Sequence, residues 1–352
     1  MNVTRVSRPL VGILGLTILV GALAYNFTHR HKGTPANAMA DAPSAPPSQA
    51  TPPADPNRST EPRGVIGDAS APATRPAILA VAISAPAPLP IVSAADAKGL
   101  LAEGKAKIDA GDLLGGRQTL NEALNSGELS APDVALAKTQ IADANKTIIF
   151  SNRHFSDDPY GGTFTVPPGG VMARIAKTYC VTPELLCRIN AMTDPRRLRA
   201  SQIIKVVQGP FHAVVNKSAF TMDLYLGGVP GEKSTMYVET LPVGLGKDDS
   251  TPTGTWIVEP GRKLTNPKYY SPRGEGVIDA ADPKNPLGKF WIGIAGTDGQ
   301  AVGKTSYGIH GTIDPTSIGK QASMGCIRMH NEDIALVYEM LVEGKSSVIV
   351  KD

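Results

Sequence analysis

The sequence has few of the features that most directly indicate a ligand. Only three of its 352 residues are cysteine, too few for a scaffold held together by disulfides. Cys180 and Cys187 are too far apart for a C-x-x-C motif and do not indicate zinc; in an oxidising compartment they would either pair or stay as buried thiols. The formal net charge is only +3, and no basic run interleaves with aromatic residues, so the sequence does not predict nucleic-acid binding.

One long stretch without charge lies near the N-terminus. Residues 9–28 carry no charged side chain and follow Arg5 and Arg8. As a helix this run would reach about 30 Å, the hydrocarbon thickness of a bilayer. We expect residues 1–32 to be a signal anchor with the arginines on the cytoplasmic side. The alternative is a signal peptide cleaved after Ala24, which would give a secreted protein. Either way the rest of the chain is expected on the envelope side of the cytoplasmic membrane, in the periplasm or cell wall.

The next two segments differ in composition. Residues 33–93 are dominated by Pro, Ala, Ser and Thr, which predicts a disordered linker because such a segment buries too little apolar surface to offset its ordering entropy. Residues 94–150 carry apolar residues at helical spacing and predict three short helices, with Ser130 as N-cap of the third. This helical segment is weakly similar to a tetratricopeptide pair. Its expected role is either a packing spacer or a protein-binding surface.

Residues suited to covalent chemistry gather near the C-terminus. They are found in His310-Gly311-Thr312 and in Ser323-Met324-Gly325-Cys326-Ile327-Arg328-Met329. A thiol with its ordinary pKa of about 8.5 is a weak nucleophile at neutral pH, and a histidine beside it can accept its proton. A glycine before the cysteine lets a carbonyl approach the backbone closely. The pattern predicts Cys326 as nucleophile and His310 as base.

These two segments resemble the active-site signature H-G-x(n)-S-x-G-C-[IV]-R-[ML] of L,D-transpeptidases with a YkuD-type catalytic domain, and every fixed position is filled. The resemblance covers residues 211–352. Thr251–Trp256 looks like the family's T-P-x-G-x-[FW] element, and Asn285–Gly288 is similar to its N-P-L-G element. Short strands separated by Gly and Pro favour a mainly β catalytic domain, a sandwich or barrel-like fold. One helix is expected after the catalytic loop, with Asn331 as its cap.

The resemblance implies a role for each residue of the signature. Cys326 would attack the carbonyl that joins the third residue of a peptide stem to its terminal D-alanine, and His310 would accept the thiol proton and then protonate the departing amine. A carbonyl near Gly311 would orient His310. The oxyanion hole would come from backbone N–H groups around Gly325 and Cys326. Ser323 would hydrogen-bond either the loop or the tetrahedral intermediate. Arg328 would either pair with a local acid and brace the loop or bind a stem carboxylate.

Residues 162–208 predict a strand, two helices and a second strand. Thr182 is the expected cap of the second helix, with Pro183 at its first position. The segment resembles a LysM peptidoglycan-binding module, which implies binding to glycan strands. It departs from that family at Gly170 and Ser201, where Asp and Gly are frequent. These departures bear on glycan affinity more than on fold.

The expected activity is that of a peptidoglycan L,D-transpeptidase, a cysteine acyltransferase that forms 3→3 cross-links between stem peptides. An L,D-carboxypeptidase or endopeptidase would use the same Cys–His pair with water as acceptor. A non-catalytic wall-binding structural protein is the third possibility. No metal or organic cofactor is required, since the pair supplies both nucleophile and base. The expected partners are stem peptides, glycan strands, the inner membrane through residues 9–28, and carbapenem-type inhibitors.

Overall fold

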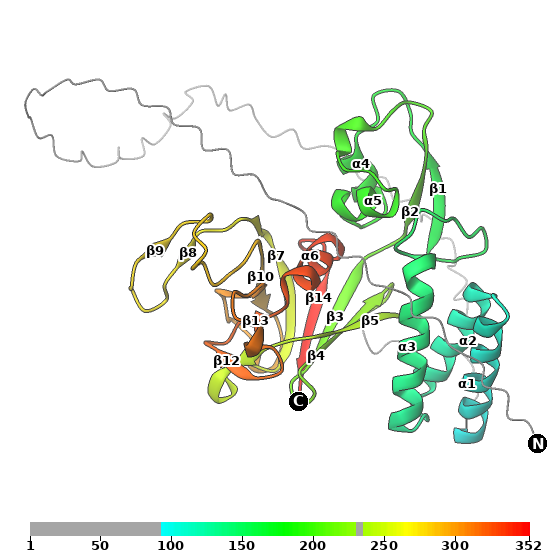
Figure 1. Ribbon diagram of the computed structural model, residues 1–352, viewed down its shortest axis with the longest axis horizontal. Helices are drawn as coiled ribbons and strands as arrows, with labels where there is room; N and C mark the ends of the chain where they lie inside the picture. Colours follow the sequence, from blue (N-terminus) through cyan, green and yellow to red (C-terminus); the bar gives the residue numbers. More distant parts are fainter. Residues whose placement is uncertain (1–92, 230–234) are drawn as a thin grey trace, which may run out of the picture. The chain divides into compact units, whose positions relative to one another are not determined.

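The computed structural model describes residues 93–229 and 235–352 (Figure 1). Within these two ranges no helix has the length and apolar character needed to cross a membrane. The predicted anchor at residues 9–28, the possible cleavage after Ala24 and the predicted linker lie outside the described residues, so these expectations remain predictions.

Three helices follow one another from residue 94, as predicted (Figure 1). They are α1 (Ala94–Asp109), α2 (Leu113–Ser126) and α3 (Ala131–Ile148). Each begins with a side chain that accepts a hydrogen bond from the backbone N–H three residues later, which satisfies one of the N–H groups that a helix start leaves unpaired. The three caps are Ser93, Asp112 and the predicted Ser130.

Residues 161–207 form a strand, two helices and a strand, in the order that the sequence predicts. The elements are β1 (Gly161–Thr165), α4 (Met172–Thr178), α5 (Pro183–Ile189) and β2 (Ile203–Val207). The two strands pair antiparallel. The hydroxyl of Thr182 accepts from the N–H of Leu185, which confirms the predicted cap. Both cysteines of this segment are free thiols, Cys180 partly exposed and Cys187 buried.

Residues 211–352 contain one curled sheet of eight strands with the order β13-β11-β10-β7-β14-β3-β4-β5. The mainly β prediction is confirmed; of the sandwich or barrel-like forms expected, the structure has a single curled mixed sheet in which β3–β14 and β11–β13 are parallel. The strands are β3 (Phe211–Asn216), β4 (Thr221–Leu226), β5 (Met236–Pro242), β7 (Gly254–Thr265), β10 (Phe290–Gly296), β11 (Tyr307–His310), β13 (Ile327–Arg328) and β14 (Ser347–Lys351).

Smaller elements surround this sheet. Two short ribbons pair β6 (Leu245–Gly246) with β12 (Gln321–Ser323) and β8 (Tyr269–Tyr270) with β9 (Val277–Ile278). Short 3-10 turns cover Pro195–Arg197, Lys247–Asp249, Gly299–Ala301 and Pro315–Ser317. The predicted helix after the catalytic loop is α6 (Asn331–Met340), but Asn331 is not its cap. His330 occupies the N-cap position, and its side chain makes no capping hydrogen bond. The amide of Asn331 instead donates to the Thr312 carbonyl.

The helical segment covers the outer edge of β5, the terminal strand of the sheet. Asn121 of α2 accepts from the Tyr237 N–H at 2.9 Å and donates to the Thr235 carbonyl at 3.0 Å. Asn145 of α3 donates to the carbonyls of Tyr237 and Val238. An uncovered edge strand offers unpaired backbone groups to other chains. These asparagines satisfy such groups from within the chain, which favours the packing role for the segment.

The apolar core does not stop at the predicted boundaries. One cluster of buried side chains contains Ile148 of α3, Leu186 of α5 and Val238 of β5 together with the interior of the sheet. Lys205 of β2 is buried and donates to the carbonyls of Ile148, Ile149 and Ser151 at 2.6, 3.1 and 2.7 Å. The residues before 210 are therefore packed onto the catalytic region.

Candidate active site

His310 lies at the end of β11 between two neighbouring strands. It is opposite Trp291 of β10 and Arg328 of β13 in the strand register. Its imidazole stacks on the Trp291 ring, with centroids 5.7 Å apart and an interplanar angle of 18°. Only 5% of the residue is exposed. The alternation of β10 directs this tryptophan to the histidine, a contact that sequence reasoning missed.

The protonation state of His310 follows from its surroundings. Burial lowers its pKa to about 4; the hydrogen bond to Gly311 acts in the opposite direction, and the positive charge of Arg328 adds to the lowering. Nδ1 lies 2.6 Å from the Gly311 carbonyl. A carbonyl can only accept, so Nδ1 carries the proton, and the neutral ring leaves Nε2 unprotonated. The ring is therefore a base at neutral pH.

The backbone after His310 is packed around the side chain of Asn331. Its amide nitrogen donates to the Thr312 carbonyl at 3.1 Å. Its amide oxygen would lie 2.2 Å from a Cβ at Gly311 and 2.5 Å from a Cβ at Gly288. Both glycines, which belong to the H-G and N-P-L-G elements, are thus needed where Asn331 approaches the backbone.

Cys326 lies in the tight loop between β12 and β13. Ser323 is buried; its hydroxyl donates to the Cys326 carbonyl at 2.6 Å and accepts from the Gly325 N–H at 3.1 Å. Gly325 has φ of +127°, a conformation that side chains rarely adopt, and a Cβ there would lie 2.7 Å from the Tyr307 ring. Ser323 therefore braces the loop, and it engages one of the two N–H groups expected in the oxyanion hole.

The thiol of Cys326 lies against β11. Burial raises its pKa, while the hydrogen bond from the Gly308 N–H and the charge of Arg328 lower it. Gly308 is two residues before His310 on the same strand, and Ile309 and Ile327 pair in parallel, so β11 and β13 bring the cysteine and histidine segments together. The net effect keeps the sulfur as a thiol, which requires a base before it can attack.

Arg328 pairs with no carboxylate in the part of the chain that the structure describes. Its backbone exchanges two hydrogen bonds of 2.8 Å with Gly244. Its Nε is buried without a hydrogen-bond partner within residues 93–229 and 235–352. A buried donor of this kind is costly unless something binds it. Pairing of Arg328 with a local acid, one of the two expected roles, has no support within these ranges.

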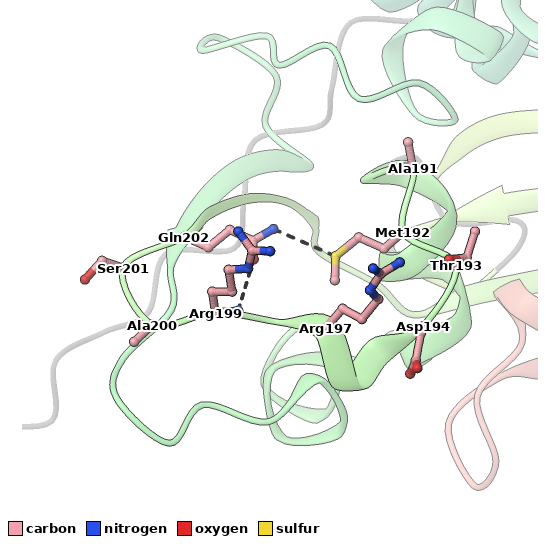
Figure 2. A pocket seen from close by; sticks show the side chains of 9 residues that line it. All are labelled: Ala191, Met192, Thr193, Asp194, Arg197, Arg199, Ala200, Ser201 and Gln202. Carbon is pink, nitrogen blue, oxygen red and sulfur yellow. Dashed lines mark hydrogen bonds between the residues drawn. The ribbon is translucent and has the colours of Figure 1, made fainter.

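A second candidate site is a depression in the loop between α5 and β2, with a volume of about 530 Å³. Both Arg197 and Arg199 line it, and Figure 2 shows their side chains inside the ring of lining residues. The neighbouring Arg196, by contrast, is bound to Asp194 through several hydrogen bonds of about 3 Å. The lining also contains Ser201, one of the departures noted in the sequence.

The region that contains this site is similar to known proteins. The L,D-transpeptidase catalytic domain of the YkuD family matches residues 210–350. The YkuD protein of Bacillus licheniformis is 30% identical over 190 residues, which cover 51% of this chain and 94% of the relative. The YqjB protein of Bacillus subtilis is 42% identical over 113 residues, covering 31% of this chain and 58% of that protein. The chain belongs to the YkuD-type L,D-transpeptidase family.

A solved structure of an L,D-transpeptidase from Mycobacterium smegmatis is 20% identical and covers 43% of this chain and 64% of its own, with a TM-score of 0.28.

Proposed function

We propose that the chain is a peptidoglycan L,D-transpeptidase that forms 3→3 cross-links through an acyl-enzyme on Cys326. The observation that carries this is the His310–Gly311 hydrogen bond together with the lowered pKa of the imidazole. These leave Nε2 as a base beside a strand that also contacts the Cys326 thiol. A neutral base and a protonated thiol are the resting state from which general-base attack begins.

The proposed reaction has two halves. In the first, the Cys326 sulfur bonds to the carbonyl carbon of the third stem residue while His310 takes the thiol proton. The bond to the terminal D-alanine then breaks, and its amine leaves with that proton. In the second, an amine of a neighbouring stem gives a proton to His310 and attacks the thioester, and the sulfur leaves and regains the proton. Arg328, with its buried unpaired Nε, is suited to hold a stem carboxylate.

The test is incubation of the protein with a purified tetrapeptide-stem disaccharide, followed by mass spectrometry. A cross-linked dimer is expected. A tripeptide product alone would indicate a carboxypeptidase, and unchanged substrate would favour a wall-binding structural protein. In parallel, treatment with a carbapenem should give a single adduct. Cys326→Ala should abolish the adduct, whereas Cys180→Ala and Cys187→Ala should keep it; an adduct at either of those thiols contradicts the proposal.

We also propose that residues 162–208 are a LysM-type module that binds glycan strands. Two observations support this. The segment has the strand–helix–helix–strand order of such modules, and a depression lies in its last loop.

Finally, we propose that the protein works at the envelope side of the cytoplasmic membrane, anchored through residues 9–28. The uncharged run behind Arg5 and Arg8 supports this. The mature protein should stay with membranes after a high-salt wash and begin near Met1. Recovery of a soluble form that begins at Tyr25 would show cleavage instead.

A further inference from the structure

Thr251, the first residue of the T-P-x-G element, is bound to the catalytic loop. It is 2% exposed. Its hydroxyl lies 2.8 Å from the Gly246 nitrogen and 2.9 Å from the Gly325 carbonyl oxygen. Gly246 can only donate and the carbonyl can only accept, so the one hydroxyl proton must point to Gly325. The direction of this hydrogen bond is therefore determined.

The hydrogen bond fixes a peptide group rather than a side chain. The Gly325 carbonyl and the Cys326 N–H belong to one peptide unit, and this unit is trans. In a planar trans peptide the C=O and N–H point in opposite directions. Because Thr251 holds the carbonyl on its own side, the Cys326 N–H is directed to the opposite side of the loop.

Of the two N–H groups expected in the oxyanion hole, one is engaged within the loop. The Gly325 N–H is already bonded to the Ser323 hydroxyl. Gly325 itself has φ of +127°, where glycine rotates with little steric resistance, so its own conformation does not hold the next peptide plane. The Thr251 hydroxyl supplies that restraint from a segment 74 residues earlier in the chain.

We propose that Thr251 is a positioning residue that aims the Cys326 N–H at the oxyanion formed when the thiol attacks. Thr251 acts through the Gly325–Cys326 peptide, whose carbonyl its hydroxyl binds. The inference rests on the proposed acyl-enzyme at Cys326. It predicts that loss of the hydroxyl weakens stabilisation of the tetrahedral intermediate and leaves the intrinsic reactivity of the sulfur unchanged.

The experiment compares two reactions of the same thiol in the full chain. Acylation by a carbapenem passes through a tetrahedral oxyanion, whereas alkylation by iodoacetamide displaces iodide and forms none. Thr251→Val removes the hydroxyl and keeps the shape. It should slow acylation by at least about 10-fold, as loss of an oxyanion donor does in other acyl-transfer enzymes. Alkylation of Cys326, located by peptide mapping, should stay within about twofold of wild type. Thr251→Ser should restore acylation.

The matched control is Thr253→Val, the same substitution two residues later at a half-buried side chain whose hydroxyl makes no hydrogen bond within residues 93–229 and 235–352. It should leave both rates unchanged. If Thr251→Val does not fold, Thr251→Cys keeps the shape with a weaker donor and should give an intermediate loss of acylation.

The outcomes separate the two proposals. Wild-type acylation by Thr251→Val, or by Thr251→Cys where that variant is used, overturns the positioning role. An equal loss of acylation and alkylation also overturns it, because that result means general disorder of the loop. Failure of wild-type protein to be acylated while Cys326 still alkylates would instead contradict the acyl-enzyme itself.

Discussion

At the scale of single residues, the proposed base is already unprotonated, whereas the proposed nucleophile is still a protonated thiol. His310 is neutral because it is buried against Trp291, and its tautomer is set by the Gly311 carbonyl. Cys326 stays a thiol because burial raises its pKa. A backbone carbonyl replaces the carboxylate that orients the base in many catalytic triads. The carbonyl therefore orients the ring without adding a carboxylate charge to a site whose burial disfavours charged groups.

The lowered pKa of His310 has a consequence for pH dependence. A base works only when unprotonated, and protonation occurs below the folded-state pKa of about 4. Acylation by a carbapenem should therefore stay constant from pH 7 to about 5 and fall as the pH drops through about 4. An exposed histidine would lose activity near its ordinary pKa of about 6.5. The measurement is the acylation rate against pH, with near-ultraviolet circular dichroism confirming the fold at each point.

Trp291→Ala gives the matched comparison. It uncovers the imidazole, and because burial is the main cause of the lowered pKa, the acid limb should move towards about 6.5. The variant should also lose activity at neutral pH through poorer orientation of the ring. An acid limb that stays in place would mean that the stacking contact does not set this pKa.

At the scale of elements, α6 contributes to the active site through its first residue. Asn331→Ala would remove the donor to the Thr312 carbonyl and leave a void beside Gly311 and Gly288. The carbonyl that orients His310 would then be less restrained, and we expect acylation to slow by about 10-fold. Glu332→Ala, an exposed neighbour in the same turn, is the control and should retain wild-type rates. Equal rates in both variants would show that Asn331 only stabilises the fold.

A second element contact concerns β2 and α3. The Lys205 ammonium satisfies carbonyls at the end of α3, where a helix leaves such groups unpaired. Lys205→Met keeps most of the stem and removes the donors, so the free energy of unfolding should fall by about 1–3 kcal/mol. Chemical denaturation would measure this. Lys177→Met, at an exposed position of α4, should change it little; a similar loss in both variants would contradict the capping role.

At the scale of the whole molecule, chemistry and wall binding are expected to depend on different residues. Arg197→Gln with Arg199→Gln removes two cations from the depression in the α5–β2 loop, which holds no residue of the Cys326 site. Pull-down with insoluble peptidoglycan should fall several-fold, because a second site raises the effective concentration on the wall. Turnover of a soluble stem disaccharide should stay unchanged. Arg174→Gln with Lys177→Gln, which removes two exposed cations of α4, is the charge-matched control. Equal pull-down by both double variants would contradict a binding role for this loop.

The sequence by itself determined those features that depend on neighbours in the chain. Thr182 and Ser130 cap their helices because a side chain and an N–H three residues on are always close at a helix start. The signature around Cys326 and His310 was recognisable because its residues occupy two short segments of the chain. The Asn331 cap was wrong, because the distant Thr312 carbonyl binds the amide of that side chain. Whether the strands form a sandwich or one curled sheet also depends on distant pairings.

Only the tertiary structure decided the rest. The fold brings together segments that lie far apart in the chain. Thr251 contacts Gly325 across 74 residues, and Lys205 contacts the end of α3 across 57 residues. The neighbouring sequence around a threonine or lysine is the same whether its hydroxyl or ammonium faces water or a distant carbonyl. The free energy that selects the carbonyl comes from burial, which excludes water and makes an unpaired polar group costly. Burial belongs to the assembled sheet and core, and no short window of sequence contains it.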